Sequence, residues 1–232
     1  MNFKGGSSAM NKTYFISDLH FSHENCLSFD NRPFKTIEEH DAELVRRWND
    51  VVGFDDDVWI LGDISWANPT KTIEIFSQLN GNKHLCIGNH DRKTLKSKNV
   101  RDLFVEIVDY KETNINGVDI ILSHYPIPCF NRHYYGAYHF YGHVHNSFEW
   151  NMMERIKYEM VALYDKPCNM FNVGCMMTYM NYTPRTFDEI TRIANQYECP
   201  KCGNENVLVN DRYKYCPDCE WAINLLEDKI NG

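Results

Sequence analysis

Nine side chains that can bind a metal ion or carry a proton follow short apolar runs of the chain. They are carboxylates, imidazoles and one carboxamide, a mixture that suits borderline divalent metals such as Mn, Fe or Zn. Their number is sufficient for two ions that share a bridging carboxylate. In chain order they are Asp18, His20, Asp63, Asn89, His90, Asp91, His124, His143 and His145.

The stretch CIGNHD (86–91) shows why one such group alone decides nothing. Gly and Asn both tolerate a positive φ, so Gly88 and Asn89 could simply form a turn. The same stretch could instead bring the backbone close to a ligand, with Asn89 binding a metal, His90 acting as an acid and Asp91 orienting it. The choice depends on partners elsewhere in the chain.

The spacing of the other groups favours a common site. Asp18 and His20 are two residues apart, as are His143 and His145, and on an extended chain such pairs point to the same side. Glycines at 62, 88 and 142 would let the backbone turn sharply where bulky ligands must converge.

The elements that must position these groups are short strands separated by helices. Short apolar runs bounded by Gly and polar residues predict buried strands, and sites in α/β sheets assemble beyond the carboxyl ends of strands. Asn116-Gly117 marks a hairpin, which makes the sheet mixed. Thr36 followed by Glu39 has the form of a helix capping box. Strands are predicted at 13–17, 58–61, 84–87, 118–122 and 138–141, and helices at 36–52, 69–81, 151–165 and 186–197.

The order D-x-H, G-D, G-N-H-D, S-H and G-H-x-H between residues 18 and 145 resembles the calcineurin-like metallophosphoesterases. Each motif is weak alone, but five in order at strand ends are specific. The resemblance implies an α/β fold, a four-layered α/β/β/α sandwich with mixed sheets. We expect that domain to span residues 12–195, after a flexible leader over residues 1–11.

The resemblance also implies a role for each group. One metal would be held by Asp18, His20, Asp63 and His145, and the other by Asp63, Asn89, His124 and His143. Two divalent ions (Mn, Fe or Zn) would hold a bridging hydroxide that attacks phosphorus. His90 would assist the leaving group, and Asp91 would fix the ring of His90.

Three further residues are candidates for binding substrate. Arg32 and Arg132 lie on loops near predicted strand ends, where an arginine could hold a phosphate through two hydrogen bonds. Both could equally be solvated loop residues. His23 closely follows the D-x-H motif and is expected near the metals.

The C-terminal segment carries a second kind of site. Two C-x2-C pairs are separated by thirteen residues, the spacing of a zinc ribbon that binds one structural zinc. The stretches NVLVN and RYKYC between them read as hairpin strands. We expect a ribbon and tail over residues 196–232, whose function the sequence leaves open. The four ligands are Cys199, Cys202, Cys216 and Cys219.

Composition limits the partners. The chain has 232 residues, a hydrophobic fraction of 43% and a net charge of −8. This charge does not favour nucleic-acid binding, which depends on Lys and Arg. No stretch is apolar enough to span a membrane, and nine cysteines without a secretory signal indicate a reducing, cytoplasmic location.

These observations predict a phosphoesterase that acts on phosphate monoesters or diesters. A phosphorylated small molecule or nucleotide is the expected substrate. The alternatives are a catalytically silent scaffold of the same fold and a nuclease targeted by the zinc ribbon. The oligomeric state, the native metals and the choice between monoester and diester are not determined by the sequence.

Overall fold

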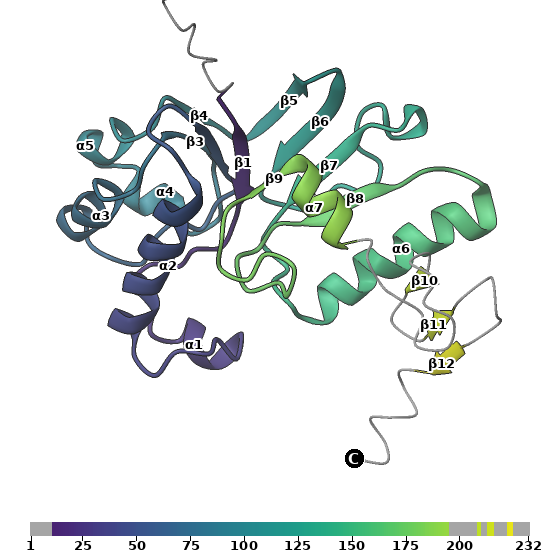
Figure 1. The fold of residues 1–232 in the computed structure, drawn as a ribbon, viewed down its shortest axis with the longest axis horizontal. Coiled ribbons are helices and arrows are strands. Elements are labelled where there is room, and N and C mark those ends of the chain that lie inside the picture. The colour runs from purple at the N-terminus through teal and green to yellow at the C-terminus, as the bar shows by residue number, and fades with distance from the viewer. Residues whose placement is uncertain (1–10, 195–207, 210–212, 216–221, 225–232) are drawn as a thin grey trace, which may run out of the picture.

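The computed structural model describes residues 11–194, 208–209, 213–215 and 222–224. Two sheets form the centre of the fold, and helices lie on the outer side of each (Figure 1). This arrangement is the mixed α/β sandwich that the sequence predicts.

The first sheet has the strand order β4-β3-β2-β1-β9. Strands β1 to β4 run parallel, and β9 pairs antiparallel with β1 at the edge. Strands β1, β2 and β3 are buried toward their carboxyl ends, so polar groups that follow them gather at one edge of the sheet. The strands are β1 (Thr13–Ile16), β2 (Asp57–Ile60), β3 (Asn82–Cys86), β4 (Glu106–Val108) and β9 (Arg185–Thr186).

The second sheet has the order β5-β6-β7-β8. It begins with the predicted hairpin at Asn116-Gly117, and β6, β7 and β8 then run parallel. Phe15 of β1 packs edge-on against Phe140 of β7 with ring centroids 4.8 Å apart, so the two sheets share one core. The strands are β5 (Tyr110–Ile115), β6 (Val118–Ser123), β7 (Tyr138–Tyr141) and β8 (Asn169–Asn172).

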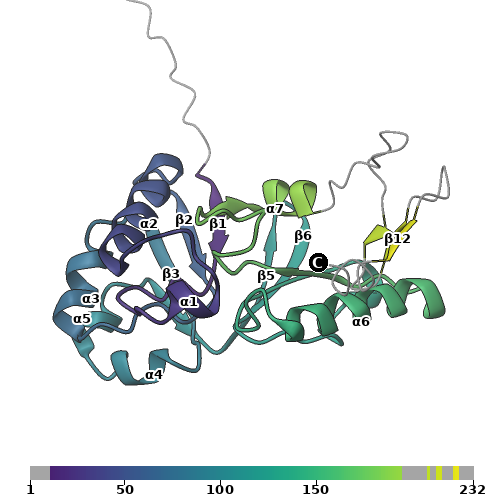
Figure 2. The same ribbon diagram turned by 90° about the horizontal axis from the view of Figure 1, so that it is seen from below.

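The helices cover the outer sides of the sheets (Figure 2). Helix α2 begins as predicted, with the Thr36 hydroxyl oxygen accepting a hydrogen bond from the Glu39 N–H at 3.2 Å. The first sheet is covered by α2 and α3, and the second by α6. The helices are α1 (Cys26–Phe29), α2 (Ile37–Val51), α3 (Pro69–Phe76), α4 (Asp91–Thr94), α5 (Lys98–Arg101), α6 (Phe148–Tyr164) and α7 (Phe187–Ala194), with one 3-10 turn over His133–Tyr135.

The predicted strands and longer helices are present, with ends displaced by a few residues. The predicted helix over 69–81 ends earlier, at Phe76, and the chain turns through Gly81 at a φ of +80°. Strands β4, β8 and β9 lie outside the five predicted strand runs; all three are edge strands, and β4 and β9 have only three and two residues.

The C-terminal segment contains three short antiparallel strands, β10 (Leu208–Val209), β11 (Tyr213–Tyr215) and β12 (Ala222–Asn224). The first two fall within the stretches expected to form a hairpin. Cys199, Cys202, Cys216 and Cys219 lie outside the described residues. Within the part of the chain that the structure describes, no helix has both the length and the apolar character needed to cross a bilayer.

Candidate metal centre

The predicted ligands come together where strands of both sheets end. Asp18 and His20 follow β1, Asp63 follows β2, and Asn89 follows β3; from the other sheet, His124 follows β6, and His143 and His145 follow β7. An isolated bridge between Ser17 and Gly174 ties the two sheets together beside this point. The site is therefore made by two sheets, and neither sheet could form it alone.

The backbone at the ligands is not extended, contrary to the expectation for the D-x-H and G-H-x-H pairs. Five ligands adopt a left-handed φ, between 49° and 70°. Such conformations cost roughly 1–3 kcal/mol each for residues other than glycine and cluster at functional sites. The surrounding backbone holds them: the His20 N–H donates to the Asp63 carbonyl at 3.0 Å, and the Asp18 N–H donates to Gly62 at 3.1 Å. The five are Asp18, His20, Asp63, His143 and His145.

The three predicted glycines lie where segments pass too closely for any side chain. A Cβ on Gly142 would lie 1.9 Å from Ser17 Oγ, and one on Gly88 would lie 2.2 Å from Asp63 Oδ1. Gly62 combines a φ of +92° with a Cβ position 2.4 Å from His124 Nδ1. Glycine at these positions is needed mainly for close approach, and only Gly62 also needs its conformational freedom.

Two overlapping groups of ligand atoms can each hold a cation. Asp18, His20 and His145 form one group, and Asp18, Asp63 and His124 form the other, with the ligand atoms of each group within 4.8 Å of one another. The Nε2 atoms of His20 and His145 are 3.4 Å apart. Asp63 Oδ2 lies 3.8 Å from His20 Nε2 and 3.6 Å from His124 Nε2, so this carboxylate faces both groups, as a bridging ligand must.

The hydrogen bonds around His124 fit a cation. His124 Nδ1 lies 2.7 Å from the Leu61 carbonyl oxygen, to which it can only donate. In the neutral ring this leaves the Nε2 lone pair facing Asn89 Oδ1 at 2.9 Å, and Oδ1 also lies 3.1 Å from His143 Nδ1. Two acceptors that face each other repel unless a metal cation or a proton lies between them. The donor set therefore suits a borderline divalent metal.

Burial makes two of the four predicted imidazole ligands available to a metal. Burial lowers the pKa of His20 well below its ordinary value and also lowers the pKa of His143, so both rings are neutral at pH 7, as metal ligands must be. Burial raises the pKa of Asp63, against the opposing effect of His124. The pKa of His145 is raised: burial opposes its protonation, but the charge of Asp18 and the hydrogen bond to Asp30 outweigh burial.

His90 lies beside the ligand cluster and is open to solvent. Its Nε2 is 3.9 Å from Asp63 Oδ2, and 43% of its side chain is exposed. Its backbone N–H donates to Asp63 Oδ1 at 3.0 Å, so the residue also helps to hold this carboxylate. An exposed imidazole at this place can reach a group bound at the cluster.

The orienting role expected for Asp91 is not supported by its contacts. Its buried carboxylate accepts hydrogen bonds from the backbone N–H groups of Asp63, Ile64 and Gly88, at 2.9, 2.8 and 2.7 Å. All three donors belong to the loops after β2 and β3, so Asp91 fixes the position of Asp63 rather than the ring of His90.

Arg32 cannot hold a substrate phosphate as expected, because its guanidinium is buried and fully used. It donates to Asp30 Oδ2 from Nε at 2.9 Å and from Nη2 at 2.7 Å, and to the carbonyls of Leu19 and Asp18. Its Nη1 also lies 2.8 Å from His40 Nε2. The other oxygen of Asp30 lies 2.8 Å from His145 Nδ1. Arg32 thus supports a metal ligand from beneath the site.

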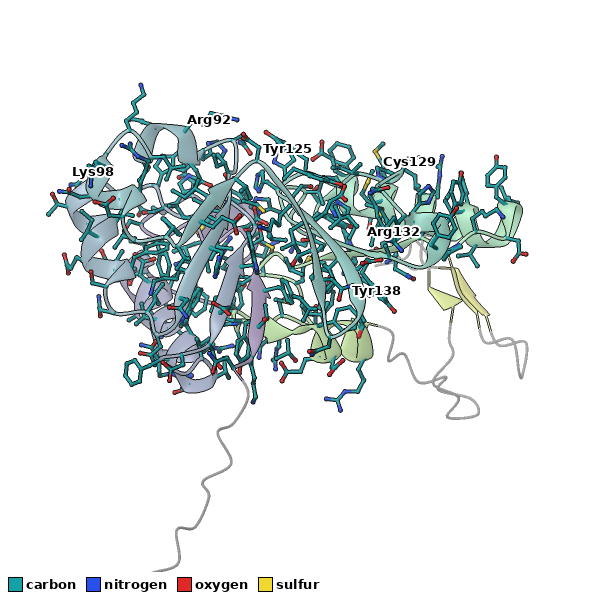
Figure 3. All side chains as sticks on the ribbon, turned by 90° about the horizontal axis from the view of Figure 1, so that it is seen from above. Arg92, Lys98, Tyr125, Cys129, Arg132 and Tyr138 are labelled. Atoms are coloured by element: carbon teal, nitrogen blue, oxygen red, sulfur yellow. The ribbon has the colours of Figure 1, made fainter. Side chains whose placement is uncertain are left out.

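Arg132 lies away from the site. Its Nε pairs with Asp119 at 3.1 Å, and Asp119 is near the start of β6, whereas His124 follows the end of that strand. The separation along the strand is about 16 Å. Figure 3 shows Arg132 and Tyr125, the neighbour of His124, at separate places on the molecule. The expectation that Arg132 binds substrate beside the metals is therefore wrong.

His23 lies beside the predicted ligand His20 as part of an aromatic group. Its ring stacks on Trp66 with centroids 4.0 Å apart and planes 6° apart, and its Nδ1 lies 3.4 Å from His20 Nδ1. Sequence reasoning missed Trp66, Phe29 and Asp30. Phe29 and Asp30 lie in the same FDNRPF stretch as Arg32, but only contacts across the fold reveal their places.

The fold and the site together define a class of protein. It is a two-sheet α/β sandwich that gathers an aspartate and histidine cluster able to bind metal at its strand ends.

Comparisons with known proteins identify the family. Residues 12–159 match the calcineurin-like phosphoesterase domain. The chain is 34% identical over 199 residues to an uncharacterized protein of Methanocaldococcus jannaschii, covering 85% of this chain and 99% of that protein. It is 44% identical over 85 residues to the gene 66 protein of Mycobacterium phage L5, covering 35% of this chain and 41% of that protein.

A solved structure shares the fold. A protein of unknown function from Aquifex aeolicus aligns with a TM-score of 0.52 and 24% identity, covering 79% of this chain and 99% of that one. The chain belongs to the calcineurin-like phosphoesterases, a family of metal-dependent hydrolases that act on phosphorylated substrates.

Proposed function

We propose that this protein is a binuclear metal-dependent phosphoesterase that hydrolyses phosphate monoesters or diesters. One ion is held by Asp18, His20, Asp63 and His145. The second is held by Asp63, Asn89, His124 and His143. Phosphorylated small molecules or nucleotides are its substrates.

The position of Asp63 carries this proposal. Its Oδ2 faces a histidine on each side, His20 at 3.8 Å and His124 at 3.6 Å. Because this carboxylate lies between histidines of the two predicted ligand sets, it could bridge two cations. Bound ions of this kind lower the pKa of water and neutralise phosphoryl oxygens.

The protein's own groups have distinct tasks in the reaction. Asp91 holds the backbone of Asp63 in place through three hydrogen bonds, one of them from the Asp63 N–H itself. His90 reaches the cluster from the solvent side, where it donates a proton or a hydrogen bond to the leaving oxygen. No arginine in the predicted substrate-binding set faces the phosphate, so charge neutralisation there depends on the ions.

Metal content and turnover test the proposal together. Protein purified without chelators should contain, or take up, up to two Mn, Fe or Zn ions at the main site. With added Mn it should hydrolyse p-nitrophenyl phosphate or bis(p-nitrophenyl) phosphate, and the preferred ester assigns monoesterase or diesterase activity. Asp63→Asn should lose metal and activity together. Full metal loading without hydrolysis of either ester would instead support a silent scaffold.

We also propose a structural zinc held by Cys199, Cys202, Cys216 and Cys219. The antiparallel pairing of β10 with β11, between the two cysteine pairs, supports this proposal. Elemental analysis should find one zinc ion beyond those at the main site.

A further inference from the structure

Three large aromatic side chains are exposed beside the metal ligands. Phe29, Trp66 and Tyr125 are 50%, 47% and 48% exposed. Each has its ring within about 6 Å of the ring of a predicted ligand. We call these three residues the aromatic rim.

Phe29 and Trp66 border the ligands that follow β1 and β7. The Phe29 ring centroid lies 5.4 Å from that of His145 and 5.6 Å from that of His23. Trp66 is stacked on His23 and lies 4.4 Å from the ring of His90. Its backbone is also fixed, because the Trp66 N–H donates to the Phe21 carbonyl at 2.8 Å. The Trp66 ring is therefore held in place before any substrate binds.

Tyr125 borders the other ligands. Its ring centroid lies 4.6 Å from that of His143 and 5.1 Å from that of His124. Exposed aromatic rings thus stand over ligands of both proposed ions.

We infer that the aromatic rim binds the base of a nucleotide whose phosphate lies at the metals. The inference rests on the proposed function and names its substrate class. Rigid exposed aromatic rings bind bases by stacking, which tolerates any base. Recognition through charge is not available from Arg32, which is buried, or from Arg132, which pairs with Asp119 elsewhere.

The geometry favours a nucleotide over an aryl phosphate such as phosphotyrosine. The rim rings contact the rings of predicted ligands, so each lies one side chain away from the atoms that would bind metal. In a nucleotide the ribose likewise holds the base away from the phosphate. In phosphotyrosine the ring is joined directly to the phosphate oxygen.

A pair of substrates that differ only in the base tests the inference. Adenosine 5′-monophosphate and ribose 5-phosphate share the same kind of primary alkyl leaving group. If the enzyme prefers diesters, the methyl esters of these two phosphates replace them. The Mn-loaded protein should give a kcat/KM roughly 10-fold or more higher for the member that carries the base.

Variants assign the effect to the rim. Trp66→Ala and Phe29→Ala should each move the ratio of the two kcat/KM values toward one, and Trp66→Phe should keep most of the preference. Phe54→Ala is the matched control: Phe54 is 82% exposed but precedes β2, at the end opposite the site. The Phe54→Ala variant should leave the ratio of the two kcat/KM values unchanged.

The outcomes separate the two proposals. If neither nitrophenyl ester is hydrolysed by metal-loaded protein, the proposed function fails. If those esters are hydrolysed but the base makes no difference in the wild-type protein, the rim inference is overturned. A phosphotyrosine peptide preferred over adenosine 5′-monophosphate would overturn it as well.

Discussion

Asp30 joins His145, a proposed metal ligand, to a buried arginine, and removing the charge of Asp30 should weaken both metal binding and folding. One oxygen lies 2.8 Å from His145 Nδ1, and the other accepts two hydrogen bonds from Arg32. Both side chains of the Asp30–Arg32 pair are almost completely buried, with 1% and 0% exposed. Asp30→Asn keeps the shape and removes the charge.

Two magnitudes follow from these contacts. A carboxylate behind a ligating histidine fixes its tautomer and orientation, and losing such a partner costs roughly 10- to 100-fold in metal affinity. Leaving Arg32 buried without a counterion costs about 3–5 kcal/mol of unfolding free energy. By contrast, Glu43→Gln removes a carboxylate that pairs with the largely exposed Arg46, and it should cost no more than about 1 kcal/mol.

A double variant separates the two effects. Asp30→Asn with Arg32→Met removes the uncompensated charge, so part of the lost stability should return. Metal affinity should stay low, because His145 still lacks its carboxylate. Urea unfolding of the metal-free protein gives the stability, and competition with a chelating dye gives the Mn affinity of the folded protein.

The reasoning would be refuted by Asp30→Asn protein that is folded and binds Mn as tightly as the wild type. It would also be refuted if the double variant recovered its metal affinity along with its stability, because the carboxylate would then matter only for folding.

Four further predictions concern separate parts of the molecule. His90→Ala should retain its metals and lose roughly 10²–10⁴ in kcat on an alkyl ester, with a smaller loss on a nitrophenyl ester; equal losses on both would leave His90 no role as an acid. Gly142→Ala places a Cβ 1.9 Å from Ser17 Oγ and 2.6 Å from Asp18 Oδ2, so thermal unfolding should show a loss of about 1–3 kcal/mol or more. Burial lowers the pKa of His139 from 6.5 to about 4, so the unfolded chain binds its proton first as the pH falls. The free energy of unfolding, measured with urea, should therefore fall by about 3 kcal/mol as the pH drops from 6.5 toward 4. The His139→Gln variant should lack this part of the pH dependence of the unfolding free energy. Cys202→Ser should lower the zinc content by one ion in elemental analysis while turnover at the main site persists; loss of turnover in folded, fully metallated protein would make the segment part of the catalytic machinery.

Local patterns were enough to predict most elements of the fold. Strands form at the apolar runs that precede Asp18, Asp63, Asn89, His124 and His143. Alternation of apolar and turn-forming residues is a local feature of the sequence, so it can be read over a few neighbouring residues. The ligands gather because the carboxyl ends of parallel strands share an edge within each sheet, and the packing of the two sheets brings both edges together. The metal ligands of each ion were predicted from a motif order and stay a proposal until metal is measured.

Contacts between distant segments decided the rest. The D-x-H pair converges through left-handed backbone held by Asp63 and Gly62, and not through an extended strand. Asp91 accepts hydrogen bonds from three backbone N–H groups, and Arg32 pairs with Asp30. Each contact forms because a buried charged group is stable only where it has hydrogen-bonding partners. The exposure of Trp66 and Phe29 beside the ligands likewise depends on how loops after β1 and β2 pack together. Residue type and spacing therefore indicated which chemistry the chain could perform, while the tertiary structure decided which predicted residues are exposed beside the cluster and which are buried in contacts that support it.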